Sequence, residues 1–222
     1  MRKVSLVTAL VLVTAMAGSA MAAPTVEIVK VKDKSLTASF SSAMDGSCGS
    51  GTAISSVDVH WDSSLIKSDG VTTMQSALLV AIQYINLCTG DNLNMSGFVT
   101  DVNGLVATDL ASGHIGATVP VTTEPDPDTG EFKSGSVTVN LNFAATGSAS
   151  TIRDRSHSRD GGVITISNFM VSARPAIATG SVSAVLPLAA GPTVVPMVNG
   201  PSLSAQIGKD ANGSITIIRH HQ

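Results

Sequence analysis

Aromatic residues are scarce in this chain, which has one Trp, one Tyr and five Phe among 222 residues. Outer-membrane barrels carry girdles of aromatic side chains at both membrane interfaces, and so few aromatic residues do not supply them. Sugar binding is not favoured either, because sugar rings stack on exposed Trp and Tyr. Trp61 and Tyr84 lie in strongly apolar segments, where we expect both side chains to belong to the core.

Charged residues are also few, at 13% of the chain, and neither sign dominates. The 13 Lys and Arg face 16 Asp and Glu, which gives a net charge of −3. Without an excess of positive charge there is no general attraction to a phosphate backbone, so we expect no binding to nucleic acid. A chain that is 43% hydrophobic with so little charge is not intrinsically disordered.

Signatures of catalysis are missing as well. The sequence contains no GxSxG, no HExxH and no P-loop motif. Asp58, His60 and Asp62 alternate on one face of an expected strand, with Trp61 on the other face. We interpret them as a solvated face opposite a buried tryptophan rather than as a metal or acid–base site. The sequence therefore predicts a protein that is not an enzyme and uses no cofactor.

The N-terminal segment has the pattern of a secretory signal peptide. Arg2 and Lys3 precede an uncharged run over residues 4–17, which is shorter than the about 20 residues that cross a hydrocarbon core. Ala20 and Ala22 then place small residues where signal peptidase inspects the chain, which predicts cleavage between Ala22 and Ala23. We expect residues 1–22 to be removed and residues 23–222 to form one domain without a transmembrane anchor, secreted or periplasmic.

Export decides how the cysteines are interpreted. Cys48 and Cys88 are the only two, and an even number in an oxidising compartment favours one intramolecular disulfide. It would close a loop of about 40 residues and add roughly 3 to 4 kcal/mol in the chain-entropy description. No CxxC motif and no third sulfur ligand are present, so a closed zinc site is not expected.

Apolar and polar residues alternate along most of the remaining chain, which is the pattern of half-buried strands. It recurs around residues 36–40, 57–61, 115–121, 137–143, 203–207 and 215–217. We therefore predict an all-β fold of about 11 to 12 strands. The expected architecture is a single antiparallel β-sandwich, either immunoglobulin-like or jelly-roll-like.

Some local features leave alternatives or specify turns. Residues 73–87 fit one face of a helix as well as one face of a strand, and their β-branched content favours the strand. Asn103-Gly104 predicts a two-residue hairpin between residues 98–101 and 105–107, because a type I′ turn needs positive φ at both positions. Residues 209–213, ending in Asn212-Gly213, likewise predict a connection between two facing strands, and Asp69-Gly70 and Gly161-Gly162 are further turn signals.

Two segments collect charge. Glu124, Asp126, Asp128 and Glu131 gather in an acidic stretch, which we interpret as a stiff hairpin tip with a weak calcium candidate at Asp126, Asp128 and Glu131. Residues 152–162 form the most positive patch of the chain, which we interpret as a long exposed hairpin loop. Its candidate anion-binding residues are Arg153, Arg155, His157 and Arg159, because guanidinium groups bind carboxylates and phosphates through paired hydrogen bonds.

Residues 84–90 (YINLCTG), 155–158 (RSHS) and 178–182 (ATGSV) resemble a scattered group of exported bacterial β-rich proteins with a single disulfide, a resemblance that implies no activity. One disulfide closing about 40 residues in an Ala-, Gly-, Thr- and Val-rich chain is also similar to the plan of chaperone–usher pilin subunits. That similarity implies an incomplete immunoglobulin-like sandwich, with residues 23–32 as a strand donated to a neighbour. The aromatic end of the pilin C-terminal strand is missing here.

The sequence thus predicts an exported, non-catalytic protein with a binding or structural role at the cell surface, in the periplasm or in the medium. Its partner is unspecified and could be a surface or extracellular protein. Two alternatives stay open, a pilin-like assembly subunit and an extracellular hydrolase whose site the sequence does not reveal.

Overall fold

The computed structural model describes residues 24–46 and 48–219 of the chain. The expected signal peptide and its cleavage site lie outside these residues. The described residues contain eleven strands: β1 (Thr25–Gly46), β2 (Gly49–Ser68), β3 (Val71–Asn86), β4 (Asp91–Thr100), β5 (Leu105–Val106), β6 (Ser112–Thr123), β7 (Ser134–Ala145), β8 (Ser150–Asp160), β9 (Val163–Leu188), β10 (Gly191–Pro196) and β11 (Ser204–Arg219). They include no helix long and apolar enough to cross a membrane.

All strands pair antiparallel in one sheet, which confirms the all-β prediction. Eight of them close a ring in the order β9, β11, β1, β2, β3, β4, β6 and β7. The long strand β9 makes the closure, because residues 163–176 pair with β11 and residues 176–185 pair with β7. The predicted sandwich of two packed sheets is not confirmed, since the same strands join into a single closed sheet.

The interior of the ring is the hydrophobic core. Side chains that alternate inward from all eight strands fill it, together with Leu110 and Met197 from the connections between strands. The largest fully buried side chains from the strands are Trp61, Phe143, Leu36, Leu78, Ile115, Leu141, Leu186 and Ile207. Polar residues occupy most of the alternate positions, which face outward, as the period-two pattern predicted. Trp61 is 2% exposed and Tyr84 is 5% exposed, which confirms that both belong to the core.

Several local predictions are confirmed. Residues 73–87, which fitted either a helix or a strand, lie almost entirely in strand β3. Asp69 and Gly70 form the turn between β2 and β3 with φ values of 49° and 79°. Cys48 and Cys88 form the expected disulfide, with an S–S distance of 1.99 Å.

The hairpin predicted at Asn103-Gly104 is wrong. Residues 105–106 pair with β6 and not with β4. Gly104 serves a close approach instead of a turn, because a Cβ atom at this position would lie 2.5 Å from Cε2 of Trp61. The segment between β4 and β6 is held over the ring interior by a hydrogen bond of 3.0 Å from Nε1 of Trp61 to the Val102 carbonyl.

The connection predicted at residues 209–213 is also wrong, since they lie inside the single strand β11. β11 runs between β1 and β9, and its register shifts between Asp210 and Ser214 against β9. The extra residue is a β-bulge, which a Gly such as Gly213 accommodates because a Cβ there would lie 2.9 Å from the Val31 carbonyl oxygen.

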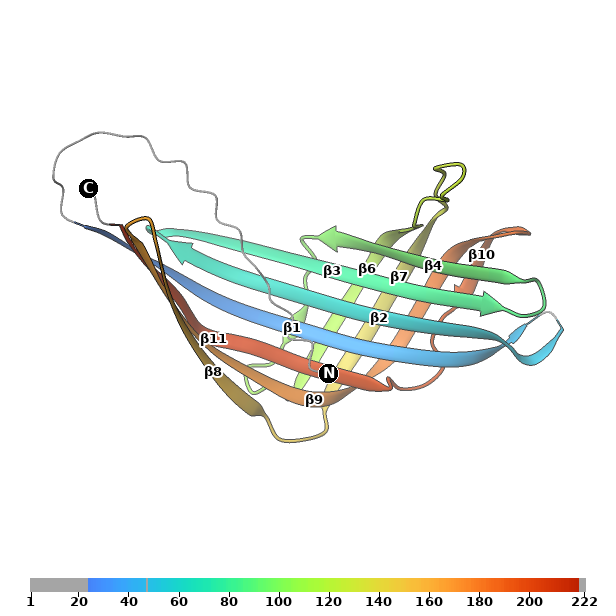
Figure 1. Ribbon diagram of the computed structural model, residues 1–222. Coiled ribbons are helices and arrows are strands. Elements are labelled where there is room, and N and C mark those ends of the chain that lie inside the picture. The colour runs from blue at the N-terminus through green and yellow to red at the C-terminus, as the bar shows by residue number, and fades with distance from the viewer. Residues whose placement is uncertain (1–23, 47, 220–222) are drawn as a thin grey trace.

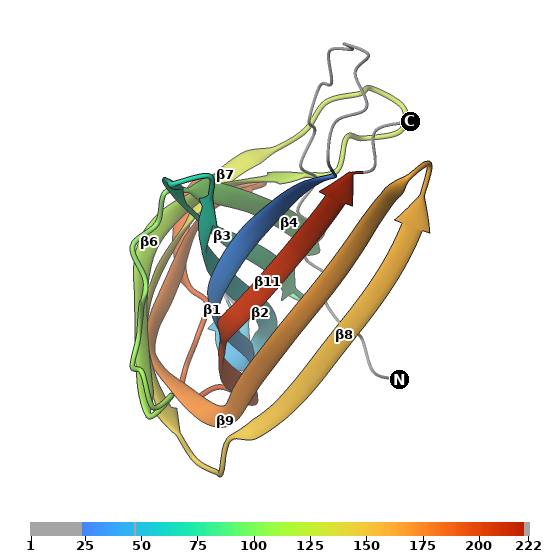
Figure 2. The same cartoon turned by 90° about the vertical axis from the view of Figure 1, so that its left-hand side faces the viewer.

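Six strands continue beyond the closed part of the ring. This part, called the extension below, comprises residues 25–34 of β1, 63–68 of β2, 71–76 of β3, 150–160 of β8, 163–173 of β9 and 209–219 of β11. Figure 1 shows it as the long arm in which β1, β2 and β3 run side by side, and Figure 2 shows β8, β9, β11 and β1 next to one another. Its inner face continues the interior of the ring.

Candidate anion-binding face

The segment interpreted as a basic hairpin loop is a strand. Residues 150–160 form β8, which pairs along its whole length with β9, so the loop interpretation is wrong. Ser150, Thr151, Ser156 and Ser158 are compatible with this edge position, and Gly161-Gly162 provides the turn into β9 with φ values of 52° and 84°. The turn signal was read correctly, but the polar composition hid a strand that is exposed on both faces.

Strand geometry places the four candidate anion-binding residues on one face. Arg153, Arg155, His157 and Arg159 occupy alternate positions of β8, and directly paired residues of neighbouring strands project to the same side. Their partners on β9 are Met170, Asn168, Ile166 and Ile164. These partners are an even number of residues from the buried Ala176 and Ala178, so they lie on the same face of β9. The four basic side chains therefore belong to the inner face of the extension.

The same face carries five lysines that sequence reasoning missed. Lys30, Lys32 and Lys34 alternate along β1 on the same face as the buried Leu36. Lys67 of β2 pairs directly with Lys30. Lys209 of β11 pairs with Lys34. The cationic face, as we call it, comprises Lys30, Lys32, Lys34, Lys67, Arg153, Arg155, Arg159 and Lys209, with His157 among them. These are eight of the eleven Lys and Arg that the chain has after Lys3.

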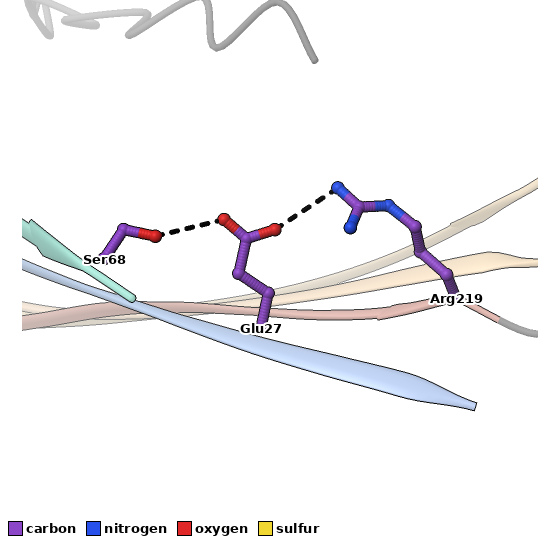
Figure 3. Close-up of polar contacts among 3 residues, drawn as sticks. All are labelled: Glu27, Ser68 and Arg219. Carbon is purple, nitrogen blue, oxygen red and sulfur yellow. Dashed lines mark hydrogen bonds and ion pairs between the residues drawn. The ribbon is translucent and has the colours of Figure 1, made fainter. Parts of the chain in front are cut away.

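The carboxylates of the same six strands alternate to the opposite face. They are Glu27, Asp33, Asp45, Asp58, Asp62, Asp154, Asp160 and Asp210. Figure 3 shows part of that outer face, where Glu27 accepts a hydrogen bond of 3.2 Å from Ser68 and forms an ion pair of 3.3 Å with Arg219. The other ion pair in the described part of the chain, His60 with Asp62, also lies on the outer side. No ion pair among the described residues neutralises the cationic face.

Two of the outer carboxylates lie next to each other, Asp210 buried and Asp33 half-buried. Asp33 pairs in register with Asp210, and one oxygen of each is buried without a hydrogen-bond partner among the described residues. Burial raises the pKa of Asp33 above its ordinary value of 3.8, a hydrogen bond with Ser64 lowers it, and the charges of Asp210 and Asp62 raise it further. The raised pKa favours the neutral form of Asp33 beside Asp210.

Apolar side chains lie between the cations on the inner face. Val26 and Ile28 continue the lysine row of β1 and are 59% and 53% exposed, and Met74 is 62% exposed. Ile164, Ile166 and Ile218 have the same orientation and are half-buried. The cationic face is therefore amphipathic, with positive charges set in an apolar surface.

Two adjoining hollows occupy this face. The first, of about 460 Å³, lies where the extension meets the ring. Its lining includes the apolar Trp61, Leu65, Met74, Val102 and Val106, the basic Lys32, Lys34 and Lys209, and the acidic Asp33 and Asp210. The second, of about 400 Å³, is lined among others by Lys30, Lys32, Leu65 and Lys67. Lys32 and Leu65 line both, so the two hollows adjoin, and we call them together the groove. The first hollow holds most of the apolar lining and is called the apolar end, and the second, with Lys30, Lys32 and Lys67, is called the cationic end.

The calcium candidate is part of the β6–β7 loop. One carboxylate oxygen of Asp126 accepts the backbone N–H groups of Asp128 at 2.9 Å and Thr129 at 3.0 Å. These hydrogen bonds lower the pKa of Asp126 below its ordinary value of 3.8, and the one from Thr129 has the largest effect. That carboxylate closes the turn, and the described residues contain no cluster of three or more His, Cys, Asp or Glu able to hold a metal ion.

Asp58, His60 and Asp62 form no enclosed site. His60 and Asp62 form an ion pair, and their side chains are 37% and 35% exposed. The hydrogen bond with Asp62 raises the pKa of His60 above its ordinary value of 6.5, although burial lowers it. Asp58 accepts a hydrogen bond of 2.6 Å from Ser39 on the neighbouring strand. The three residues lie on the polar outer side of β2, opposite Trp61.

The comparisons with known proteins add no relative to this description. No protein-family model matches the chain, and neither a curated protein nor a solved structure is significantly similar to it.

Proposed function

We propose that this is an exported, non-catalytic binding protein whose cationic face binds a polyanionic ligand. The observation that carries the proposal is the separation of charge. The chain has a net charge of −3 and eleven Lys and Arg beyond Lys3, and eight of these eleven lie on one face of one sheet. Like charges on one surface repel each other, so their concentration is unfavourable unless an anion neutralises them. Guanidinium groups in a row suit phosphate or carboxylate groups of such a ligand.

Protection of a sheet edge does not account for this arrangement. Charged side chains on an edge strand hinder pairing with other chains, and β8 is an edge strand of the extension. That role would explain Arg153, Arg155 and Arg159. It leaves Lys30, Lys32 and Lys34 unexplained, because β1 lies between β11 and β2 in the interior of the sheet.

The two alternative functions have less support. Donation of an N-terminal strand to a neighbouring pilin would require that strand to be available, whereas residues 25–31 pair with β11 of the same chain. A hydrolase would place a histidine beside a carboxylate in a cleft. His157 has Arg155 and Arg159 on its own side of β8, and His60 with Asp62 lies on the outer side.

Binding to heparin, used as a defined polyanion, tests the proposal. The matched variants are Arg155→Glu and Lys30→Glu on the cationic face and Lys133→Glu, an exposed residue just before β7. All three change the net charge equally. If each basic residue near an anionic surface contributes about 1 kcal/mol, a reversal at the cationic face weakens binding roughly 30-fold. Lys133→Glu should leave binding within about threefold of the unmodified protein.

Salt dependence completes the test. Screening shortens the Debye length from about 10 Å at 0.1 M salt to about 3 Å at 1 M, so heparin binding should be lost over that range. Equal affinity of the three variants, or an affinity that does not respond to salt, would contradict the proposal and leave the basic residues as solubilising charges.

A further inference from the structure

We infer that the ligand of the cationic face is an anionic amphiphile, with its alkyl or acyl chain in the hollow beside Trp61 and its anionic head among the lysines. This inference rests on the proposed function and names the ligand class. It depends on three observations: the apolar lining beside Trp61, the lysines of the second hollow, and the residues Lys32 and Leu65 that line both hollows.

The apolar end offers an apolar surface to a chain of methylenes. Trp61 lies at the inner end, fixed by its hydrogen bond to the Val102 carbonyl, and Leu65 with Met74 lines the side formed by β2 and β3. The segment 102–108 forms the opposite wall. A volume of about 460 Å³ is within the usual range of about 300 to 1,000 Å³ for small-molecule sites.

The wall formed by residues 102–108 is held in position. Asp101 donates its backbone N–H to the Ser76 carbonyl at 2.9 Å, and Ala107 donates to the Ser112 carbonyl at 2.9 Å. Lys209 of the cationic face donates a hydrogen bond to the Thr108 carbonyl. The hollow is therefore a preformed feature with contacts on both sides, and one of its cations also stabilises its wall.

The cationic end accounts for the head group. Lys32 lies at both hollows, and Lys30 and Lys67 lie beyond it on paired positions of β1 and β2. An amphiphile with its chain directed toward Trp61 places its head group at these three ammonium groups. A purely polar anion would leave Leu65 and Met74 facing water, whereas a neutral lipid would leave the lysines without a counter-charge.

Titration with n-alkyl phosphates below their critical micelle concentrations tests the inference on the full exported protein. Trp61 is the only Trp of the chain and lines the hollow, so its fluorescence reports occupancy directly, and calorimetry gives the affinity. Each fully buried methylene strengthens binding about fourfold, so dodecyl phosphate should bind at least tenfold more tightly than octyl phosphate. Inorganic phosphate and dodecyltrimethylammonium should both bind at least tenfold more weakly than dodecyl phosphate.

Two substitutions on β3 provide a matched pair. Met74 and Val71 are 62% and 64% exposed, and alternation places them on opposite faces. Met74→Glu introduces a carboxylate into the hollow and should weaken dodecyl phosphate binding at least tenfold. Val71→Glu should leave it within about twofold, and both variants should fold because neither side chain is buried.

Other results would overturn this inference, and they can be distinguished from a failure of the proposed function. Equal affinity for inorganic phosphate and dodecyl phosphate, or for Met74→Glu and Val71→Glu, would mean that the hollow takes no chain while the cationic face still binds anions. Equal affinity for dodecyltrimethylammonium would mean that charge has no role. Binding to phosphatidylglycerol vesicles without binding of monomeric dodecyl phosphate would assign the face to a membrane surface. If the unmodified protein did not bind heparin, the proposed function itself would be contradicted.

Discussion

Gly104→Ala tests the packing that forms the inner end of the groove. A Cβ atom at position 104 would lie 2.5 Å from Cε2, 2.6 Å from Cζ2 and 2.8 Å from Cδ2 of Trp61. Trp61 is 2% exposed, and core side chains surround its indole. To reach ordinary contact, either the indole or the backbone of residues 102–104 has to move by about 1 Å.

The cost has two parts. Overpacking of a core usually costs about 1 to 3 kcal/mol. If the movement breaks the 3.0 Å hydrogen bond from Nε1 of Trp61 to the Val102 carbonyl, a buried donor loses its partner, which costs about 1 to 3 kcal/mol more. Residues 102–104 are not part of a strand and can shift outward, so we expect a loss near the lower end, about 2 kcal/mol.

Urea unfolding followed by circular dichroism and by Trp61 fluorescence measures this loss, with Gly116→Ala as control. Gly116 is exposed on β6, and a Cβ there would meet its nearest atoms at 3.7 and 3.8 Å. Because Gly weakens a strand, this control should be unchanged or more stable by up to about 1 kcal/mol. If Gly104→Ala and Gly116→Ala agree within about 0.5 kcal/mol, the account of Gly104 as a close-approach residue is refuted.

Three further predictions concern the disulfide, export and pH. Replacing Cys48 and Cys88 together by Ala opens a loop with a sequence separation of 40 residues and should lower the free energy of unfolding by about 4 kcal/mol; unchanged urea midpoints would contradict this. Mass analysis of the exported protein should find Ala23 as the first residue, and an intact Met1 on that form would show the signal peptide prediction to be wrong. The hydrogen bond with Asp62 raises the pKa of His60, so the stability it contributes is complete below pH 6.5 and is lost as the pH rises through the folded-state pKa. NMR titration should find the pKa of His60 above 6.5 and lower in Asp62→Asn than in the unmodified protein, and equal values would contradict the assignment.

Local patterns in the sequence were sufficient for most elements of this fold, but not for β8, whose polar residues favour a loop. Alternation of apolar and polar residues identified most strands and the inward side chains, including Trp61, because each strand with one buried face repeats every two residues. The even number of cysteines, taken with the predicted export, was sufficient to predict the disulfide. Turn residues were reliable where the chain reverses, as at Asp69-Gly70, but the same residue types at Asn103-Gly104 and Asn212-Gly213 serve a close approach and a bulge.

The candidate site was only partly accessible in this way. The basic residues of β8 were noticed because they are adjacent in sequence. The alternate spacing of Lys30, Lys32 and Lys34 was a usable signal, since residues two apart in a strand share a face. Lys67 and Lys209 gave no such signal, because nothing local relates them to β1 or β8.

Pairing between distant strands decides both the ring and the cationic face. Alternation specifies which residues share a face of their own strand, but it does not specify the neighbouring strand, the register or the side on which a ring closes. Lys34 and Lys209 meet only through the pairing of β1 with β11, and Arg153 joins their face only because β8 and β11 both pair with β9. The alternation of apolar and polar residues determines that the chain forms strands with one buried side, whereas long-range backbone hydrogen bonding gathers dispersed charges on one surface.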